Sequence, residues 1–172
     1  MISVTIESYN GAKALMAENQ YTKIISLVDI NSPVTSTGPN HLVLTVTDIV
    51  VMPERFNGPY INPKMIPVLP DISHVDTVLA HTADMVDGDS LLIHCAAGKS
   101  RSAAMAWAVL IQHGMTFEEA FHHVKTIRPQ AIPNQLMVAL IDQKFGFGNA
   151  MREFYTNWYS TQVGIENLTA LF

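Results

Sequence analysis

The sequence predicts a single α/β domain in which a central, mainly parallel sheet is flanked by helices. Two observations favour this fold class. Candidate strands alternate with candidate helices along the chain, and the strand candidate at 90–93 carries three consecutive apolar residues. A strand without a polar face is typical of a parallel sheet that is covered on both sides. The length of 172 residues and the 48% content of hydrophobic residues fit one domain with a substantial core.

The first third of the chain contains three strand candidates and one short helix. Residues 2–6 alternate between apolar and polar side chains, which indicates an edge strand. Residues 23–28 and 41–46 are two further strand candidates, separated by turn-forming residues. We expect Asn10 to cap a short helix over residues 12–17.

Residues 49–69 form a proline-rich segment, with prolines at positions 53, 59, 63 and 67. Proline lacks a backbone N–H and fixes its own φ, so this density excludes a helix or a central strand. Long loops are uncommon in compact domains unless they have a function. We therefore expect an ordered loop or lid, inserted ahead of the next helix.

The rest of the chain is predominantly helical apart from the buried strand at 90–93. The expected helices cover residues 71–86, 103–111, 117–127, 135–145 and 150–160. Asp71 or Ser73 caps the first of them, Thr116 and Glu119 have capping-box spacing, and Asn134 caps the fourth. Residues 150–172 are expected to form a C-terminal helix with aromatic residues at helical spacing, followed by a tail.

Charge and cysteine content restrict the class of protein. The formal net charge is −5 and only 15% of residues are charged, which argues against nucleic acid or an anionic membrane as a partner. The N-terminal residues lack the features of a secretory signal, and no apolar stretch is long enough to span a bilayer. A single cysteine excludes an internal disulfide. We expect a cytoplasmic enzyme.

The loop between the buried strand and the all-apolar helix carries the chemistry. A helix start offers free backbone N–H groups and a positive dipole end, so residues 96–101 predict an anion site. Cys95 lies at its mouth, where positive potential favours the nucleophilic thiolate. Arg101 can bind two phosphate oxygens at once, Gly98 lets the backbone turn its amides inward, and Ser102 can donate a hydrogen bond to the sulfur. The expected phosphate-binding residues are Ala96, Ala97, Gly98, Lys99, Ser100 and Arg101.

The pattern His-Cys-x-x-Gly-x-x-Arg-Ser at 94–102 resembles the signature of the cysteine-dependent protein tyrosine phosphatase superfamily. The flanking strand and helix, and more loosely residues 21–145, resemble its dual-specificity branch. The resemblance implies the phosphotyrosine-phosphatase fold and hydrolysis of phosphate monoesters through a phosphocysteine on Cys95. The implied substrates are phosphotyrosine, with phosphoserine and phosphothreonine in addition, on a protein or a small molecule. No metal or other cofactor is implied, and His94 is implied to orient the loop and to help set the pKa of Cys95.

The resemblance also implies a carboxylic acid that protonates the leaving group and then activates water. Asp48 is our first choice, because it follows the strand candidate at 41–46 as the acid of the family does. Asp71 is the rival, since Pro70-Asp71 resembles the acid loop of the larger tyrosine phosphatases. An Asp directly before a helix is more often an N-cap, which favours Asp48.

Several other activities are compatible with parts of the pattern. Lys99 alone supports a phosphoinositide, nucleotide or RNA phosphatase, and a misplaced acid would indicate a phosphate-binding pseudophosphatase. A sulfur-transfer enzyme of the rhodanese kind also has its cysteine in an anion loop, but His94 and Ser102 disfavour it. A nucleotide P-loop would need glycine where Ile93 stands, and a zinc site would need further ligands for the lone cysteine.

Overall fold

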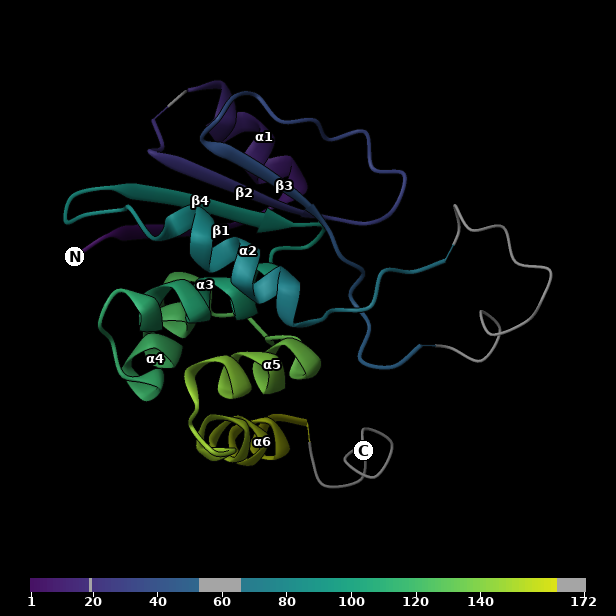
Figure 1. Cartoon of the computed structure of the whole chain (residues 1–172), viewed down its shortest axis with the longest axis vertical. Helices are drawn as coiled ribbons and strands as arrows, with labels where there is room; N and C mark the ends of the chain where they lie inside the picture. Colours follow the sequence, from purple (N-terminus) through teal and green to yellow (C-terminus); the bar gives the residue numbers. More distant parts are fainter. Residues whose placement is uncertain (19, 53–65, 164–172) are drawn as a thin grey trace.

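A computed structural model of the chain describes residues 1–18, 20–52 and 66–163. Its centre is a four-stranded sheet in the order β1-β4-β2-β3, in which every neighbouring pair is parallel. The strands are β1 (Ser3–Ser8), β2 (Lys23–Val28), β3 (His41–Thr45) and β4 (Ser90–Cys95). The predicted fold class is therefore confirmed, with β1 on an edge as expected and β4 buried in the middle (Figure 1).

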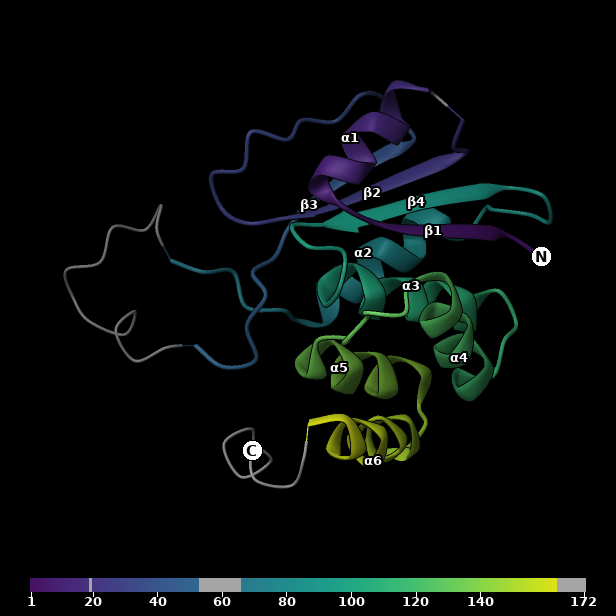
Figure 2. The same cartoon turned by 180° about the vertical axis from the view of Figure 1, so that it is seen from behind.

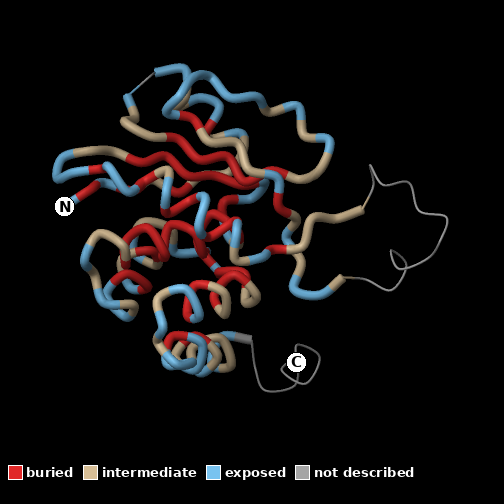
Figure 3. The backbone as a smooth tube through the Cα atoms, in the orientation of Figure 1, coloured by how far each residue is buried: buried red, intermediate tan, exposed pale blue. Residues whose placement is uncertain are grey.

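The helices cover the two faces of the sheet unequally. Helix α1 (Tyr9–Ala17) lies alone on one face, and the remaining helices lie on the other in both views (Figures 1 and 2). These are α2 (Ile72–Thr82), α3 (Arg101–Gln112), α4 (Phe117–Ile127), α5 (Gln135–Phe145) and α6 (Ala150–Val163). Helix α3 is buried from Arg101 to Ile111, so the helix that follows the phosphate-loop motif is the centre of the core (Figure 3). An apolar helix fits this place because no side of it meets water.

Two predicted helix boundaries are wrong. Helix α1 begins at Tyr9 and is capped by Ser8, whose Oγ accepts from the Gly11 N–H at 3.3 Å, rather than by Asn10. Ser8 is also the last residue of β1 and pairs with Cys95, so the strand runs directly into the helix. Helix α2 ends at Thr82 instead of near Val86, because the chain turns there and leaves Val86 exposed.

The C-terminal helix is confirmed and packs against the body of the domain. Asp142, which is buried near the end of α5, accepts hydrogen bonds from the backbone N–H groups of Asn149, Met151 and Arg152. These bonds satisfy free donors at the start of α6. Tyr155 of α6 is buried against Trp107 and Phe121. Within the described residues, no helix combines the length and the apolar character that crossing a membrane requires.

The proline-rich segment lies largely outside the described residues. Its flanks at 49–52 and 66–69 form neither helix nor strand, as expected. Two hydrogen bonds join Val68 to Thr47. The Val68 carbonyl accepts from the Thr47 backbone N–H, and the Val68 N–H donates to the Thr47 hydroxyl. This pair fixes where the segment leaves and rejoins the domain. Residues 53–65, and the tail beyond residue 163, are not described.

Candidate active site

The predicted phosphate loop spans residues 96–100 and connects the end of β4 to the start of α3. Gly98 adopts φ +66°, and a Cβ at this position would collide with the backbone of Glu7. Only glycine accommodates both the left-handed conformation and this close approach. The glycine of the motif is therefore required by the way the loop passes over the end of β1.

Every carbonyl of the loop is held from outside. Tyr9 N–H donates to the Ala96 carbonyl at 3.1 Å, and Ile132 N–H donates to the Lys99 carbonyl at 2.8 Å. Arg128 donates to the Gly98 carbonyl at 3.0 Å and to the Ala97 carbonyl at 3.3 Å, and it also pairs with Glu7. The Ser100 carbonyl accepts from within α3 and from Asn134.

The N–H groups of residues 96–100 have no oxygen partner in the described part of the chain. These five donors lie next to the positive end of the helix α3 dipole, and the Gly98 N–H is directed at the Cys95 sulfur. The sequence predicted an anion site at this loop. The outward hydrogen bonds of the carbonyls of residues 96–99 turn the N–H groups of residues 97–100 inward, because the carbonyl and the N–H of one peptide unit point in opposite directions.

Cys95 is placed at the base of this loop with its thiol buried; its side chain is 2% exposed. Its Sγ lies 3.3 Å from the Ser102 Oγ. Burial alone would raise the pKa of the thiol. Hydrogen bonds from Ser102 and Gly98 and the positive charge of Arg101 outweigh burial, so the pKa of Cys95 lies below its ordinary value. The arrangement favours the thiolate over the thiol.

Arg101 is held on one side and free on the other. Its Nη1 donates to the Val46 carbonyl at 2.8 Å, and its two Nη atoms each lie 3.1 Å from one Asp29 oxygen. Its Nε is buried and has no hydrogen-bond partner among the described residues. A buried unpaired donor on a guanidinium is costly, and an anion in the loop would satisfy it.

Asp29 is a residue that sequence reasoning missed. It follows β2, which lies beside β4, so its carboxylate emerges at the same edge of the sheet as Cys95. Polar residues at the carboxyl ends of adjacent parallel strands converge, and this rule could have identified Asp29 as a site residue.

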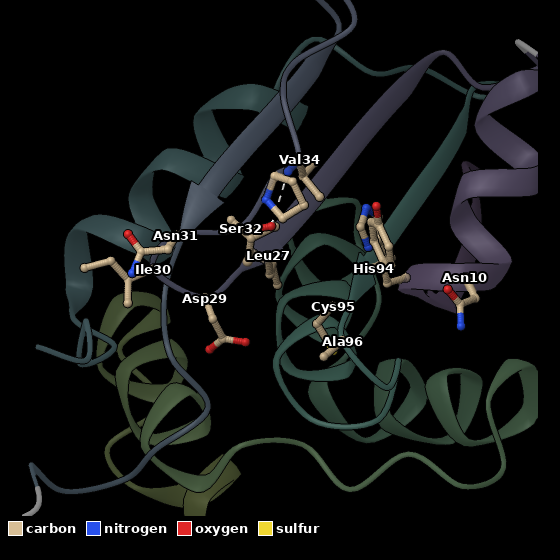
Figure 4. A pocket seen from close by; sticks show the side chains of 13 residues that line it. Asn10, Leu27, Asp29, Ile30, Asn31, Ser32, Val34, His94, Cys95 and Ala96 are labelled. Atoms are coloured by element: carbon tan, nitrogen blue, oxygen red, sulfur yellow. Dashed lines mark hydrogen bonds between the residues drawn. The ribbon is translucent and has the colours of Figure 1, made fainter. Parts of the chain in front are cut away.

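A pocket of about 400 Å³ opens between the start of the loop and the β2–β3 connection. In Figure 4, Cys95, Ala96 and His94 lie on one side of it, and Asp29 and the residues after it lie on the other. Most of its lining is apolar, namely Leu27, Val28, Ile30, Pro33, Val34 and Ala96, together with the side chain of Tyr9. Among the described lining residues, no lysine or arginine occurs and Asp29 is the only carboxylate.

Asp48 lies beside the loop but does not line the Cys95 pocket. Its Oδ1 accepts from the Ser100 Oγ at 2.6 Å and from the Asn134 Nδ2 at 2.9 Å. Asn134 also caps α5 as expected, through a 3.1 Å bond from the Met137 N–H. Asp48, Ser100 and Asn134 share a second, open hollow with Tyr159.

Asp71 is engaged elsewhere. Its carboxylate caps α2 by accepting from the N–H groups of Ser73 and His74, and the His74 ring in turn accepts from the Asp71 N–H. The Ser73 hydroxyl and the other bonds lower the pKa of Asp71. The cap reading that the sequence favoured for Asp71 is confirmed.

Two more of the expected site residues are His94, as a supporting residue, and Lys99, as a phosphate-binding residue. His94 is buried at the end of β4, and its Nε2 lies 2.6 Å from the Ser26 Oγ, a side-chain partner that no sequence motif reveals. Lys99 is exposed, and its backbone is fixed by the bond from Ile132.

Comparison with known proteins agrees with this geometry. Residues 9–144 match the family model described as "Dual specificity phosphatase, catalytic domain". The chain belongs to this family. The family is the dual-specificity branch of the cysteine-dependent tyrosine phosphatases that the motif at 94–102 indicated.

Individual proteins resemble the chain over shorter stretches. Dual specificity protein phosphatase 1 of Arabidopsis thaliana is 52% identical over 48 residues, which are 27% of this chain and 24% of that protein. Phosphatidylglycerophosphate phosphatase PTPMT2 of the same organism is 41% identical over 54 residues, covering 30% and 24%. The chain thus matches about a quarter of the length of these two relatives. The crystal structure of human DUSP28 superposes with a TM-score of 0.57 at 25% identity, covering 86% of this chain and 94% of that one.

Proposed function

We propose that the chain hydrolyses phosphate monoesters by two displacements at phosphorus, with Cys95 as nucleophile. The observation that carries the proposal is the loop itself. A thiol of lowered pKa lies beside five N–H groups and a buried Arg101 Nε that have no oxygen partner in the described part of the chain. These groups match the three non-bridging oxygens of a phosphoryl group and the charge that develops on them. Membership of the dual specificity phosphatase family supports the same reaction.

The two steps balance with the residues present. In the first, the Cys95 thiolate forms an S–P bond while the P–O bond to the leaving group breaks, and Asp48 gives its proton to the departing oxygen. In the second, water forms a P–O bond to phosphorus, the S–P bond breaks to regenerate the thiolate, and Asp48 takes the proton from the water. Arg101 and the loop amides hold the phosphoryl oxygens throughout.

Asp48 is proposed as the acid because its carboxylate is hydrogen-bonded to the phosphate loop, at the Ser100 hydroxyl. Asp71 is committed to the cap of α2, and both oxygens of Asp29 face the Arg101 guanidinium. Asp48 makes its two hydrogen bonds through Oδ1, which leaves Oδ2 without a partner among the described residues. A free carboxyl oxygen is what a proton donor to substrate requires.

The proposed substrates are phosphotyrosine and, in addition, phosphoserine and phosphothreonine. The Cys95 pocket is lined mainly by apolar groups and has no described cationic side chain, which suits an aryl or alkyl leaving group. A polyanionic inositol or nucleotide would find only the exposed Lys99 as an additional cation on the loop. A reducing compartment such as the cytoplasm is part of the proposal, since a thiolate of low pKa is easily oxidised.

The test is hydrolysis of p-nitrophenyl phosphate as a function of pH, without added metal, by the parent and by Cys95→Ser, Asp48→Asn and Asp71→Asn. We expect Cys95→Ser to abolish turnover, Asp48→Asn to remove the alkaline limb of the profile, and Asp71→Asn to leave the profile unchanged, because Asn also caps helices. A phosphotyrosine peptide, a phosphothreonine peptide and a phosphoinositide are then compared by kcat/KM. A parent that binds vanadate but turns over none of these would be a phosphate-binding module instead. Preference for the lipid would assign the chain to the lipid phosphatases.

A further inference from the structure

A buried chain of polar side chains runs from the phosphate loop across the sheet. Ser26 of β2 has 0% exposure, and its Oγ lies 2.6 Å from the His94 Nε2 and 2.7 Å from the His41 Nε2. His94 is directly opposite Ser26 in the β2–β4 register, and His41 pairs with Ile24, two residues before Ser26 on the same face of β2. These three residues join the strand that ends in Cys95 to β3, on the face covered by α1.

The far end of this chain fixes where the protons lie. The backbone N–H of Thr37 donates to the His41 Nδ1 at 3.1 Å, and a backbone N–H can only donate. The Nδ1 of His41 is therefore unprotonated, and a neutral ring carries its proton on Nε2, where it donates to Ser26. The hydroxyl of Ser26 then has its one proton left for the His94 Nε2. It follows that His94 carries its own proton on Nδ1.

This order of protons places a ring N–H on the side of the Cys95 backbone. Because the His94 Nε2 is engaged with Ser26, the Nδ1 edge is the one left to face the Cys95 backbone, where it is buried without a hydrogen bond of normal geometry. An N–H directed at the Cys95 backbone turns the positive end of its dipole toward that residue and favours negative charge there, whereas a ring lone pair would oppose it. The tautomer of His94 thus matters to Cys95.

We propose that Ser26 and His41 are positioning residues that hold His94 neutral, in its Nδ1–H tautomer, and thereby sustain the Cys95 thiolate. The catalytic role of these residues rests on the proposed phosphatase reaction. The chain of hydrogen bonds does not depend on that reaction, because it is a property of the folded protein alone.

The surroundings keep both rings uncharged. Burial, and to a smaller extent His81 of α2, lower the pKa of His41. Burial lowers the pKa of His94 against the opposing effect of the Cys95 backbone, and His41 lowers it further. Tyr9 of α1 faces His94 at 6.1 Å between ring centroids, and Glu7, opposite His94 on β1, is paired with Arg128.

The first measurement is the rate at which iodoacetamide alkylates Cys95, as a function of pH, in the parent and in three variants. Ser26→Ala removes the donor to His94, so we expect the midpoint of the curve to move up by about one pH unit, which corresponds to tenfold in thiolate population at low pH. Ser26→Thr keeps a hydroxyl and should restore the parent curve. Ser90→Ala removes a hydroxyl from the opposite end of β4 and serves as the matched control. In turnover, Ser26→Ala should lower kcat and leave KM nearly unchanged.

The second measurement reads the tautomers directly in the unmodified protein, by long-range proton–nitrogen NMR correlations of the histidine rings. We expect His41 to be protonated on Nε2 and His94 on Nδ1 at neutral pH. A His94 ring protonated on Nε2, or an alkylation curve of folded Ser26→Ala that superimposes on the parent curve, would overturn the proposal. If Ser26→Ala does not fold, the NMR result decides. A parent with the expected tautomers but no turnover would overturn the proposed function and leave this inference standing.

Discussion

The two sides of the phosphate loop are built differently. On the side of Cys95 and Arg101, both side chains are almost fully buried, and their partners are backbone groups, the adjacent Ser102 and the ion pair with Asp29. On the side of Asp48, the carboxylate is held by two side-chain bonds, from Ser100 and Asn134, next to an open hollow. The nucleophile is fixed by the core of the fold, whereas the proposed acid is fixed by two side-chain hydrogen bonds beside an open hollow.

This difference separates two kinds of sensitivity. Moving a group that the core positions costs both activity and stability, because the same contacts serve both. Moving a group that is held by one exposed and one partly buried hydrogen bond costs less stability, since each such bond contributes about 1 kcal/mol. Variants on the first side should therefore lose folding and turnover together, and variants on the second side should lose turnover selectively.

Apart from removal of the nucleophile itself, the largest effect is expected for Gly98→Ala, on the buried side. The new Cβ would collide with the Glu7 backbone and would force alanine into φ +66°, which costs about 1–2 kcal/mol before any collision. We expect a loss of at least about 100-fold in kcat/KM, since a misplacement of about 1 Å has an effect of that size, together with a lower melting temperature. Gly148→Ala has the same φ cost but no neighbour within 4 Å, so it should destabilise the protein without loss of activity. Equal activity losses in the two variants would contradict the claim that the close approach to β1 shapes the loop.

A tenfold effect is expected for Asp29→Asn. The amide keeps one acceptor but turns a donor toward the Arg101 guanidinium, so one charge-assisted bond of the fork is lost, at a cost of about 1.5 kcal/mol. Steady-state kinetics with p-nitrophenyl phosphate should give a kcat/KM about one-tenth of the parent value. Asp76→Asn removes a similarly exposed carboxylate from a surface pair with Lys144 and should have no effect. An unchanged kcat/KM in Asp29→Asn would mean that the Val46 carbonyl alone orients Arg101.

Features that depend on neighbouring residues in the sequence could be predicted, and features that depend on contacts between distant residues could not. The strands at 23–28 and 90–93 and the motif from His94 to Ser102 are local patterns, and the structure has them in the expected places. Asp29, Ser26 and His41 escaped prediction because they reach the site only through the strand order β1-β4-β2-β3. Asp29 meets Arg101 across 72 positions, and Ser26 meets His94 across 68. The strand order cannot be deduced from the local pattern of apolar and polar residues.

The error at the start of α1 has the same origin. Asn10 and Ser8 are both good N-cap residues by propensity. The choice between them depends on where β1 stops, and β1 continues to Ser8 because Ser8 pairs with Cys95 of the neighbouring strand. The contact that decides the helix start is thus made with a residue 87 positions further along the chain, and it also brings Tyr9 to the Ala96 carbonyl.

The smallest loss of activity with an activated ester is expected for substitution of Asn134. This substitution also tests how Asp48 is held in place. Asn134→Asp keeps an oxygen that caps α5 but replaces the amide donor to Asp48 with a second carboxylate, so stability should stay close to the parent value while Asp48 is displaced. We expect a loss of about threefold with p-nitrophenyl phosphate, whose leaving group needs little protonation, and a larger loss with an alkyl phosphate, which depends on the acid. Asn134→Ala removes the cap as well and should cost about 1 kcal/mol of stability in addition. If Asn134→Asp slows both esters equally, Asn134 supports the loop and not the acid. In that case the hydrogen bond from the Ser100 hydroxyl is the one that positions Asp48 for catalysis. Ser100→Ala should then slow the alkyl phosphate more than p-nitrophenyl phosphate.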